Sequence, residues 1–370
     1  MGNVFVVGTG TIGEPLIGLL ADHKSQLGIE EIFFTKLNPL RSGKPKINDL
    51  VERGAKFVCY EESTKEFEKI GIHPVATFLE ALAESAIAIE CTKKGVGLKN
   101  REKYYSLPKY SGKYFVSQGS EYGFGTMYAR NISDRILIGK KGHEVDQFWT
   151  VVSCNTHNAA VIIDTIGMNQ GKIGPDNILD CQLVYIRRAN DVGQIGGFIP
   201  SIEVGRHTDA EAGGHQARDA RKLFKTLGYD LSIWASIAKA PTQYMHAMHF
   251  CLTLAEKITL DEVFSRVENN RLIAITKSEE KKDKQSCEVF SFGRDHGYFG
   301  RILNQTVLVE NTVTIRKSPF GYQVIGWCFT PQDGNSLLST ASLVDWLLNP
   351  ESYPEKASIF LKRPYTFREV

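Results

Sequence analysis

The stretch that decides the fold reads VFVVGTGTIG and runs from Val4 to Gly13. Its four apolar residues predict a short buried strand, and the glycines behind them fit the pattern G-x-G-x-x-G. Residues 14–21 (EPLIGLLA) then have the apolar spacing of a helix. A strand, a glycine-rich turn and a helix in this order form the context in which that pattern binds a dinucleotide. We therefore predict a dinucleotide site at the start of this helix.

The glycines of this turn have separate expected roles. Gly8 permits the tight turn, Gly10 lets the backbone approach a pyrophosphate, and Gly13 allows the helix to pack closely on the strand. The amides at the helix N-terminus would face the phosphates. The alternative is a glycine-rich turn that binds no ligand. The cofactor contacts expected here come from Gly8, Gly10, Thr11, Ile12 and Gly13.

The second predicted strand, residues 31–35 (EIFFT), indicates which cofactor is bound. Sites that select NAD place an acidic residue at the end of this strand, where it binds the ribose 2′-hydroxyl. Here the strand ends in Thr35 and Lys36, a hydroxyl and a cation. These groups suit a 2′-phosphate, so NADP is favoured and NAD remains possible. The alternative for Lys36 is a solvated surface lysine.

The order of the apolar runs divides the 370 residues into two parts. In residues 1–150, short strands alternate with helices, which predicts βαβ units and a parallel sheet, a Rossmann domain. In residues 151–332, longer strands predict an α+β catalytic domain with a mixed, mostly antiparallel sheet. A helix at about 333–350 is expected to pack back on the first domain. The other predicted strands are 57–60, 86–90, 114–116, 183–187, 198–204, 271–275, 307–310 and 322–329, and the other predicted helices are 77–85 and 210–226.

The composition excludes several classes of protein. Lys and Arg number 44 against 42 Asp and Glu, so the net charge of +2 argues against a nucleic-acid or membrane-surface partner. No apolar run approaches the roughly 20 residues of a membrane span. The seven cysteines are odd in number, widely spaced and without a CxxC pair, so neither a disulfide framework nor a metal site is expected. We expect a reduced, cytoplasmic protein.

The segment VVSCNTHN, residues 151–158, contains the candidate nucleophile. A short apolar strand ends there and a helical pattern begins, which places Cys154 at a helix N-terminus. Backbone amides at such a position lower a thiol pKa and can stabilise an oxyanion. With a nicotinamide cofactor, a cysteine nucleophile implies aldehyde oxidation through a thiohemiacetal and a thioester. The alternative is a small buried apolar side chain.

Taken together, the motifs resemble the archaeal-type (type II) phosphorylating glyceraldehyde-3-phosphate dehydrogenases along nearly the whole chain. No single motif is decisive, but their order is specific. The resemblance implies a homotetramer that takes a small phosphorylated aldehyde and inorganic phosphate. It also implies cofactor contacts from Thr92, Gln118 and Gly119. The motifs are GTGTIG at 8–13, TK at 35–36, CTKKGVGLKN at 91–100, SQG at 117–119, SCNT at 153–156, RRAND at 187–191, KAPTQYMH at 239–246 and RD at 294–295.

The residues expected to bind the substrate match the family's motifs less closely than those expected to bind the cofactor. It implies catalytic roles for Cys154 and Asn155 and an anion site built by Arg187 and Arg188. Thr156 and Arg206 are further candidates for that anion site. The family's arginine after the nucleophile motif is missing, because residues 157–161 read HNAAV.

The general base has three candidates, because the loop that carries the family's catalytic histidine is altered. A base of near-neutral pKa must take the hydroxyl proton as hydride leaves the thiohemiacetal. His215, followed by Asp219, fits the H-x-x-x-D pattern best, and His207 and His157 are the alternatives. Before the last predicted helix, Asn335 matches the family's asparagine only loosely.

Three functions follow from these observations. The leading one is an NADP-preferring, phosphorylating dehydrogenase of glyceraldehyde 3-phosphate or a close relative, which forms an acyl phosphate. The second keeps the chemistry but changes the substrate, as in a related semialdehyde dehydrogenase or an acyl-phosphate or acyl-thioester reductase. The third is an NADP-binding sensor without turnover.

Overall fold

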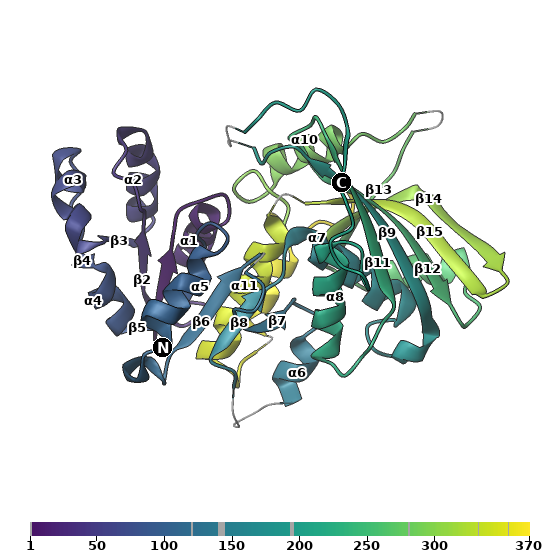
Figure 1. The fold of residues 1–370 in the computed structure, drawn as a ribbon, viewed down its shortest axis with the longest axis horizontal. Coiled ribbons are helices and arrows are strands. Elements are labelled where there is room, and N and C mark those ends of the chain that lie inside the picture. Colours follow the sequence, from purple (N-terminus) through teal and green to yellow (C-terminus); the bar gives the residue numbers. More distant parts are fainter. Residues whose placement is uncertain are drawn as a thin grey trace. The chain divides into compact units, whose positions relative to one another are not determined.

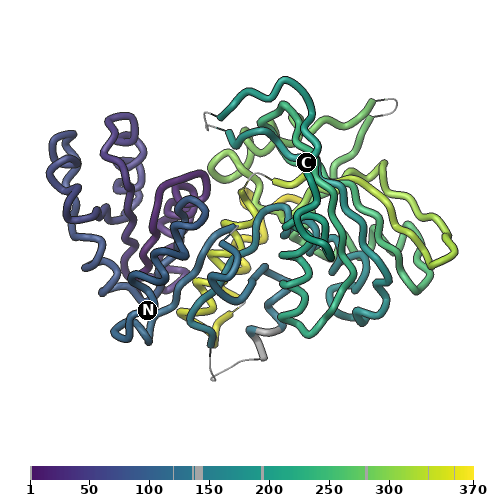
Figure 2. The backbone as a smooth tube through the Cα atoms, viewed as in Figure 1, coloured from purple at the N-terminus to yellow at the C-terminus, as the bar shows by residue number. Residues whose placement is uncertain are grey.

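The computed structural model describes residues 2–119, 121–139, 145–192, 196–279, 282–331, 333–353 and 355–370 (Figures 1 and 2). The chain forms two compact units, and each is described by itself. The first unit comprises Met1–Arg130, Leu137–Val151 and Leu337–Ile359. The second unit comprises Asn131–Ile136, Val152–Ser336 and Phe360–Val370.

The first unit is built on an eight-stranded sheet with the order β4-β3-β2-β1-β5-β6-β8-β7. Every recorded strand pair in it is parallel. Helices connect most of these strands, as parallel pairing requires. The Rossmann architecture expected from the sequence is confirmed. The strands are β1 (Gly2–Val7), β2 (Ile29–Thr35), β3 (Lys56–Cys59), β4 (Ala76–Thr77), β5 (Ser85–Glu90), β6 (Tyr114–Gln118), β7 (Thr126–Tyr128) and β8 (Phe148–Val151).

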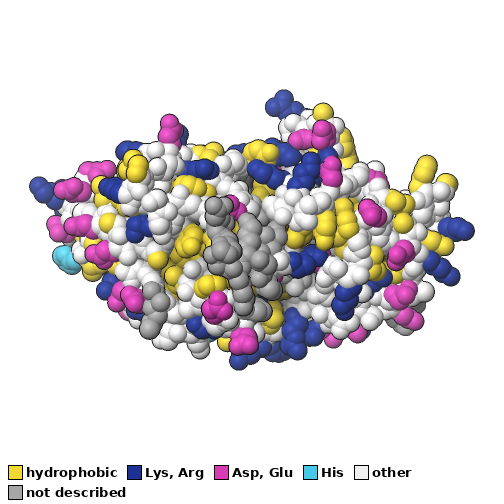
Figure 3. Space-filling view, turned by 90° about the horizontal axis from the view of Figure 1, so that it is seen from below, with side chains coloured by type: hydrophobic (Ala, Val, Ile, Leu, Met, Phe, Trp, Pro, Cys, Tyr) yellow, Lys and Arg dark blue, Asp and Glu magenta, His cyan; other side chains and the backbone are white. Residues whose placement is uncertain are grey.

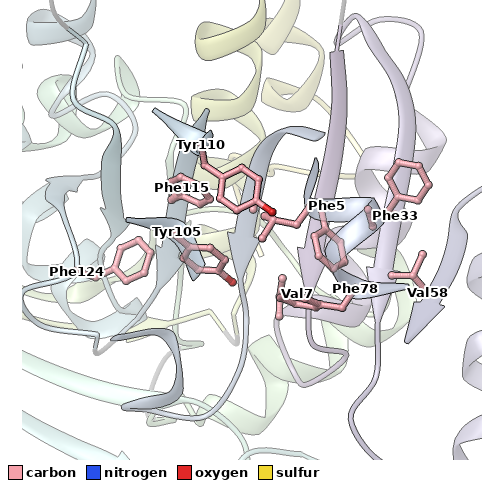
Figure 4. Packing of buried hydrophobic residues seen from close by; sticks show 12 residues of the cluster. Phe5, Val7, Phe33, Val58, Phe78, Tyr105, Tyr110, Phe115 and Phe124 are labelled. Carbon is pink, nitrogen blue, oxygen red and sulfur yellow. The ribbon is translucent and has the colours of Figure 1, made fainter. Parts of the chain in front are cut away.

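Aromatic side chains fill one core of this unit (Figure 4). Phe5 of β1 packs edge to face on Phe78, and Tyr105 stacks on Phe115 of β6. Burial of such rings is the main stabilising contribution to a core of this kind. The helices are α1 (Gly13–Asp22), α2 (Lys44–Glu52), α3 (Thr64–Lys69), α4 (Phe78–Glu84) and α5 (Val96–Asn100).

The second unit is built on a seven-stranded sheet with the order β10-β11-β9-β12-β15-β14-β13. The β11–β9 and β13–β14 pairs are parallel and the others are antiparallel, so the expected mixed, mostly antiparallel sheet is confirmed. The strands are β9 (Ile178–Arg188), β10 (Glu203–Val204), β11 (Ile233–Ala240), β12 (His246–Leu254), β13 (Ile273–Thr276), β14 (Thr306–Ser318) and β15 (Gly321–Thr330). The helices are α7 (Cys154–Ile162), α8 (His215–Lys225), α9 (Leu260–Glu268) and α10 (Ser286–His296), while α6 (Asp134–Gly139) begins in this unit and ends in the first.

The last helix, α11 (Gly334–Leu348), begins in the second unit and belongs to the first from Leu337 onward. Within the first unit, Thr340 of α11 accepts a hydrogen bond from Gln118, and Trp346 contacts Trp149 edge to face. No helix in the described part of the chain is long and apolar enough to cross a membrane. Both signs of charge are spread over the face shown in Figure 3, in keeping with the nearly balanced composition.

Two expected elements differ in the structure. The strand predicted at 198–204 is wrong, because only β10 forms there and the apolar side chain of Phe198 is 89% exposed. The helix predicted at 210–226 begins only at His215. The preceding residues form a tight bridge between Asp209 and Gly213, and Gly213 has a φ of +69° that a helix cannot include.

Candidate functional site

The glycine-rich turn of the first unit requires glycine at Gly13 and leaves open space at Gly10. Gly8 has a φ of +102° and donates its amide to the carbonyl of Thr35 over 3.2 Å. A β-carbon on Gly13 would lie 2.0 Å from the carbonyl oxygen of Gly8, so only glycine fits at this position. A β-carbon on Gly10 would meet nothing nearer than 3.9 Å. The backbone at Gly10 is therefore open to a ligand, and Thr11 and Ile12 follow directly at the start of α1.

The end of β2 carries the two groups that the sequence assigned to a 2′-phosphate. Thr35 is buried, and its hydroxyl oxygen has no hydrogen-bond partner among the described residues. Lys36 is partly buried and donates from Nζ to the hydroxyl of Thr9 over 3.3 Å. Burial, followed by the nearby Lys46 cation, lowers the pKa of Lys36. Lys36 is therefore held against the glycine-rich turn and differs from a freely solvated lysine.

The three remaining cofactor candidates lie at or just after the ends of β5 and β6, at the carboxyl edge where such sheets bind dinucleotides. Thr92 donates its hydroxyl to Glu90 over 2.6 Å. Gln118 donates from Nε2 to Thr340 over 2.7 Å, and its buried Oε1 has no partner in the described chain. A β-carbon on Gly119 would meet nothing within 4 Å. These residues leave polar atoms and space along the same edge as the glycine-rich turn, so they fit a dinucleotide.

Two buried carboxylates at this edge were missed in the sequence. Glu90, the last residue of β5, accepts hydrogen bonds from Asn100 over 2.8 Å and from the Tyr105 hydroxyl over 2.6 Å. Burial raises the pKa of Glu90. Glu121 accepts the amide of Gly95 over 2.5 Å. For Glu90, the signal in the sequence is an acidic residue directly after the apolar residues of AIAIE. Such a residue lies at the end of a buried strand, at the edge of the sheet where ligands bind.

In the second unit, Cys154 is the first residue of α7, as the sequence predicted for a nucleophile. Its carbonyl oxygen accepts a hydrogen bond from Asn335 Nδ2 over 3.1 Å. Burial raises the pKa of Cys154 to about 11, although Arg188 and Arg187 act to lower it. The expectation of a lowered pKa at this position is therefore wrong, because loss of solvation, reinforced by Asp333 and Asp191, outweighs both arginines.

The two residues after Cys154 anchor the helix. The backbone carbonyl of Asn155 accepts the Tyr185 hydroxyl over 3.0 Å, and its side-chain oxygen accepts the Thr330 hydroxyl over 3.3 Å. Thr156 is fully buried, and its hydroxyl lies 3.0 Å from that of Ser153. These contacts fix the start of α7 against the sheet and so fix the position of Cys154.

Arg188, at the end of β9, lies in the same site and is only 4% exposed. It donates from Nε to Asp191 over 2.7 Å, and its Nη2 lies 3.6 Å from Asp333 Oδ1. Its Nη1, like the Nε of Arg187, is buried without a hydrogen-bond partner among the described residues. Unpartnered guanidinium nitrogens in a buried site are donors available to an anion.

The candidate bases differ sharply in their surroundings. His157 is fully buried with Nδ1 3.1 Å from the Ser153 carbonyl, and burial lowers its pKa to about 4. His207 is exposed, with Nε2 3.2 Å from the Ser236 hydroxyl and its ring against Trp234, and Arg206 beside it is exposed as well. His215 is partly buried at the start of α8, which packs beside α7.

One further histidine, His246, contacts the arginine site. Its Nδ1 accepts the backbone amide of Arg188 over 3.0 Å. Burial, followed by the charge of Arg188, lowers its pKa well below the usual value. The imidazole is therefore neutral, and it supports the backbone of Arg188.

A Rossmann unit with a glycine-rich turn, and a second unit in which the half-buried Cys154 interacts electrostatically with two arginines, fit the class of nicotinamide-dependent dehydrogenases. No family model matches the chain. The chain is, however, similar to several enzymes named glyceraldehyde-3-phosphate dehydrogenase. It is 27% identical over 315 residues to that of Sulfurisphaera tokodaii, which covers 84% of this chain and 82% of that protein.

Two other enzymes with the same name are similar to this chain. The enzyme of Sulfolobus acidocaldarius is 24% identical over 311 residues, 84% of this chain and 82% of that protein. The enzyme of Methanobacterium bryantii is 25% identical over 285 residues, 76% of this chain and 75% of that protein. The resemblance drawn from the motifs is confirmed at low sequence identity, because several enzymes with this name are similar to most of the chain.

Proposed function

We propose that this chain is a phosphorylating, NAD(P)-dependent aldehyde dehydrogenase that oxidises glyceraldehyde 3-phosphate or a close relative. One observation carries the proposal: Cys154 begins α7 within the electrostatic reach of Arg188, whose Nη1 is buried and unpartnered. The glycine-rich turn and the names of the relatives support the same reaction.

The reaction begins when Cys154 Sγ attacks the aldehyde carbon and a thiohemiacetal forms. A bound nicotinamide dinucleotide would supply the hydride acceptor, and loss of the hydride and the hydroxyl proton from the thiohemiacetal would leave a thioester on Cys154. Inorganic phosphate then attacks the thioester carbon, an acyl phosphate leaves, and the Cys154 sulfur is regenerated. In this proposal, backbone amides at the start of α7 stabilise the oxyanion of each addition step.

Proton transfer needs a group other than Cys154 itself. With a pKa of about 11, Cys154 is a thiol near neutral pH, so a base must remove its proton or the hydroxyl proton of the thiohemiacetal. We assign this role to His215, with His207 as the alternative. His157 fits least, because its ring is buried against the Ser153 carbonyl and its pKa is about 4.

Arg187 and Arg188 hold the anionic group of the substrate in this proposal. Guanidinium groups suit phosphate because their donors lie in one rigid plane. Of the other two anion candidates, Arg206 is exposed and Thr156 is bonded to Ser153 in the interior. Arg188, which is buried, and Arg187, which is partly buried, therefore carry the anion site.

We further propose that NADP is the preferred cofactor. The support is that Lys36 and Thr35 stand at the end of β2, where this fold recognises the ribose, and that the Thr35 hydroxyl has no partner among the described residues. NAD remains the alternative. A cytoplasmic location is supported by the cysteines, because all seven are described and free. A homotetramer is proposed from the resemblance alone.

The test is an assay of NADPH formation from glyceraldehyde 3-phosphate with and without inorganic phosphate. We expect phosphate-dependent turnover in the wild type and a loss of about 10³-fold or more in Cys154→Ser. Circular dichroism checks that the variant is folded. The proposal fails if the folded wild type shows no phosphate-dependent reduction of NADP or NAD.

A second function has one observation in its favour, the absence of an arginine in residues 157–161. A semialdehyde with a different anionic group, or the reverse reduction of an acyl phosphate or acyl thioester, would suit such a change. Parallel assays with carboxylate-bearing aldehydes distinguish the two functions by kcat/KM. A folded protein that binds NADP but turns over none of these compounds would instead be a sensor.

A further inference from the structure

The loop before α11 places an unexpected carboxylate in the arginine site. Asp333 is 6% exposed, and its Oδ1 lies 3.6 Å from Arg188 Nη2. Its Oδ2 has no hydrogen-bond partner in the described chain. A buried carboxylate oxygen without a donor is costly, so its retention calls for an explanation.

The backbone of this loop is held in a strained conformation. Asp333 has a φ of +59°, in the left-handed region that residues other than glycine seldom adopt. The next residue must be glycine, because a β-carbon on Gly334 would lie 1.9 Å from the Ile302 carbonyl oxygen. Asn335 then bonds through Nδ2 to the carbonyls of Cys154 and Gln305. The loop is therefore tied on one side to the backbone of the nucleophile, and its carboxylate faces Arg188 on the other.

The charges around Asp333 belong to the same site. Burial raises the pKa of Asp333 to about 6, opposed by Arg188 and Arg301 and reinforced by Asp191. The negative charge of Asp333 in turn raises the pKa of Cys154. The other charged or titratable groups that act on this site are Arg187, which lowers the pKa of Cys154, and His246, which is neutral.

We propose that Asp333 is a positioning residue that holds Arg188 by Nη2, so that the unpartnered Nη1 stays directed to the anionic group of the substrate. A guanidinium is planar, so fixing Nε through Asp191 and Nη2 through both carboxylates fixes the direction of Nη1. Asp191 is partly exposed and Asp333 is buried, so Asp333 is the more rigidly held of the two carboxylates that contact Arg188. The choice of a substrate with an anionic group rests on the proposed function. The expected effect of Asp333 on the Cys154 thiol does not.

The first test needs neither substrate nor cofactor. The full chain is treated with iodoacetamide at pH 7.5, and the rate of Cys154 labelling is followed by peptide mass spectrometry. Asp333→Asn removes the charge and keeps the shape, and Asp333→Gly also relieves the strain. We expect both variants to label Cys154 at least about threefold faster, because loss of the negative charge lowers the pKa of the thiol.

The second test uses turnover. With glyceraldehyde 3-phosphate we expect KM to rise about tenfold in both variants while kcat stays within about twofold. The reason is that Arg188, no longer held in place, binds the anionic group of the substrate more weakly before the reaction begins. In the wild type, KM should also rise as the pH falls through about 6, where Asp333 takes up a proton, and this inflection should vanish in Asp333→Asn.

Asp345→Asn is the matched control. Asp345 is also buried with a pKa raised to about 6 by burial, but it bonds to Asn349 in the first unit. Neither labelling nor KM should change in this variant. Unchanged labelling and KM in both Asp333 variants, or equal changes in Asp345→Asn, would overturn the inference. Faster labelling in a protein that turns over no aldehyde would support the coupling of Asp333 to Cys154 and overturn the proposed function instead.

Discussion

Asn335 donates a hydrogen bond from Nδ2 to the carbonyl oxygen of Cys154 over 3.1 Å, across 181 positions of sequence. The same amide lies 3.3 Å from the carbonyl of Gln305, and Asn335 is fully buried. The first turn of α11 therefore supports the backbone of the candidate nucleophile. The sequence motif around Asn335 matched only loosely, yet its side chain is bound into the site.

Replacing Asn335 by alanine should affect both stability and turnover. The buried carbonyl of Cys154 would lose its donor, at a cost of about 1–3 kcal/mol. We expect kcat to fall about tenfold because Cys154 is less well fixed. Urea denaturation and steady-state kinetics measure the two effects. Asn349→Ala is the control, since Asn349 donates to Leu27 over 2.7 Å in the first unit. An equal loss of kcat in both variants would contradict the assignment.

The two later glycines of the turn should respond differently to alanine. In Gly13→Ala the β-carbon would lie 2.0 Å from a backbone oxygen, so we expect a loss of about 3 kcal/mol or more in unfolding free energy. In Gly10→Ala the nearest atom is 3.9 Å away, so the fold should persist while the dinucleotide binds at least about tenfold more weakly. Thermal unfolding and cofactor titration distinguish the two. Undiminished binding by a folded Gly10→Ala would place the pyrophosphate elsewhere.

Lys36 should set the cofactor preference. A charge-assisted hydrogen bond contributes about 1.5–3 kcal/mol, so Lys36→Ala should weaken NADP binding about tenfold or more and leave NAD binding nearly unchanged. Isothermal titration with both cofactors measures the ratio. Lys56→Ala serves as the control, because Lys56 pairs with Glu31 over 3.2 Å and should not alter the preference. A similar loss for NADP and NAD in Lys36→Ala would rule out a 2′-phosphate contact.

Much of the first unit could be predicted from local sequence, for physical reasons. The βα turn at Gly8–Gly13 depends on steric constraints that act within a few residues, and strands buried on both faces read as apolar runs. The strand predicted at 198–204 was wrong because an apolar segment is not always buried, and Phe198 is exposed. The strand β12 was not predicted, although its buried and half-buried residues alternate as in a strand with one covered face.

Only those parts of the candidate site that are formed by residues close together in sequence could be predicted. The SCNT motif led to Cys154 at a helix N-terminus, but its pKa depends on burial, which a motif cannot reveal. Asp333 and Asn335 lie far from Cys154 in sequence and reach the site through tertiary packing. The link between His246 and Arg188 likewise arises from two strands paired side by side.

The buried His157 should make the protein sensitive to mild acid. In the folded state its pKa is lowered to about 4, whereas an unfolded histidine has a pKa of about 6.5, so the unfolded chain binds more protons between these values. Its contribution to stability is therefore present above about pH 6.5 and falls as the pH decreases, by about 2 kcal/mol at pH 5. His157→Gln, which does not titrate, should lose correspondingly less stability than the wild type between pH 7 and pH 5 in urea denaturation. Parallel pH profiles for the two proteins would mean that His157 is protonated, or solvated, in the folded state.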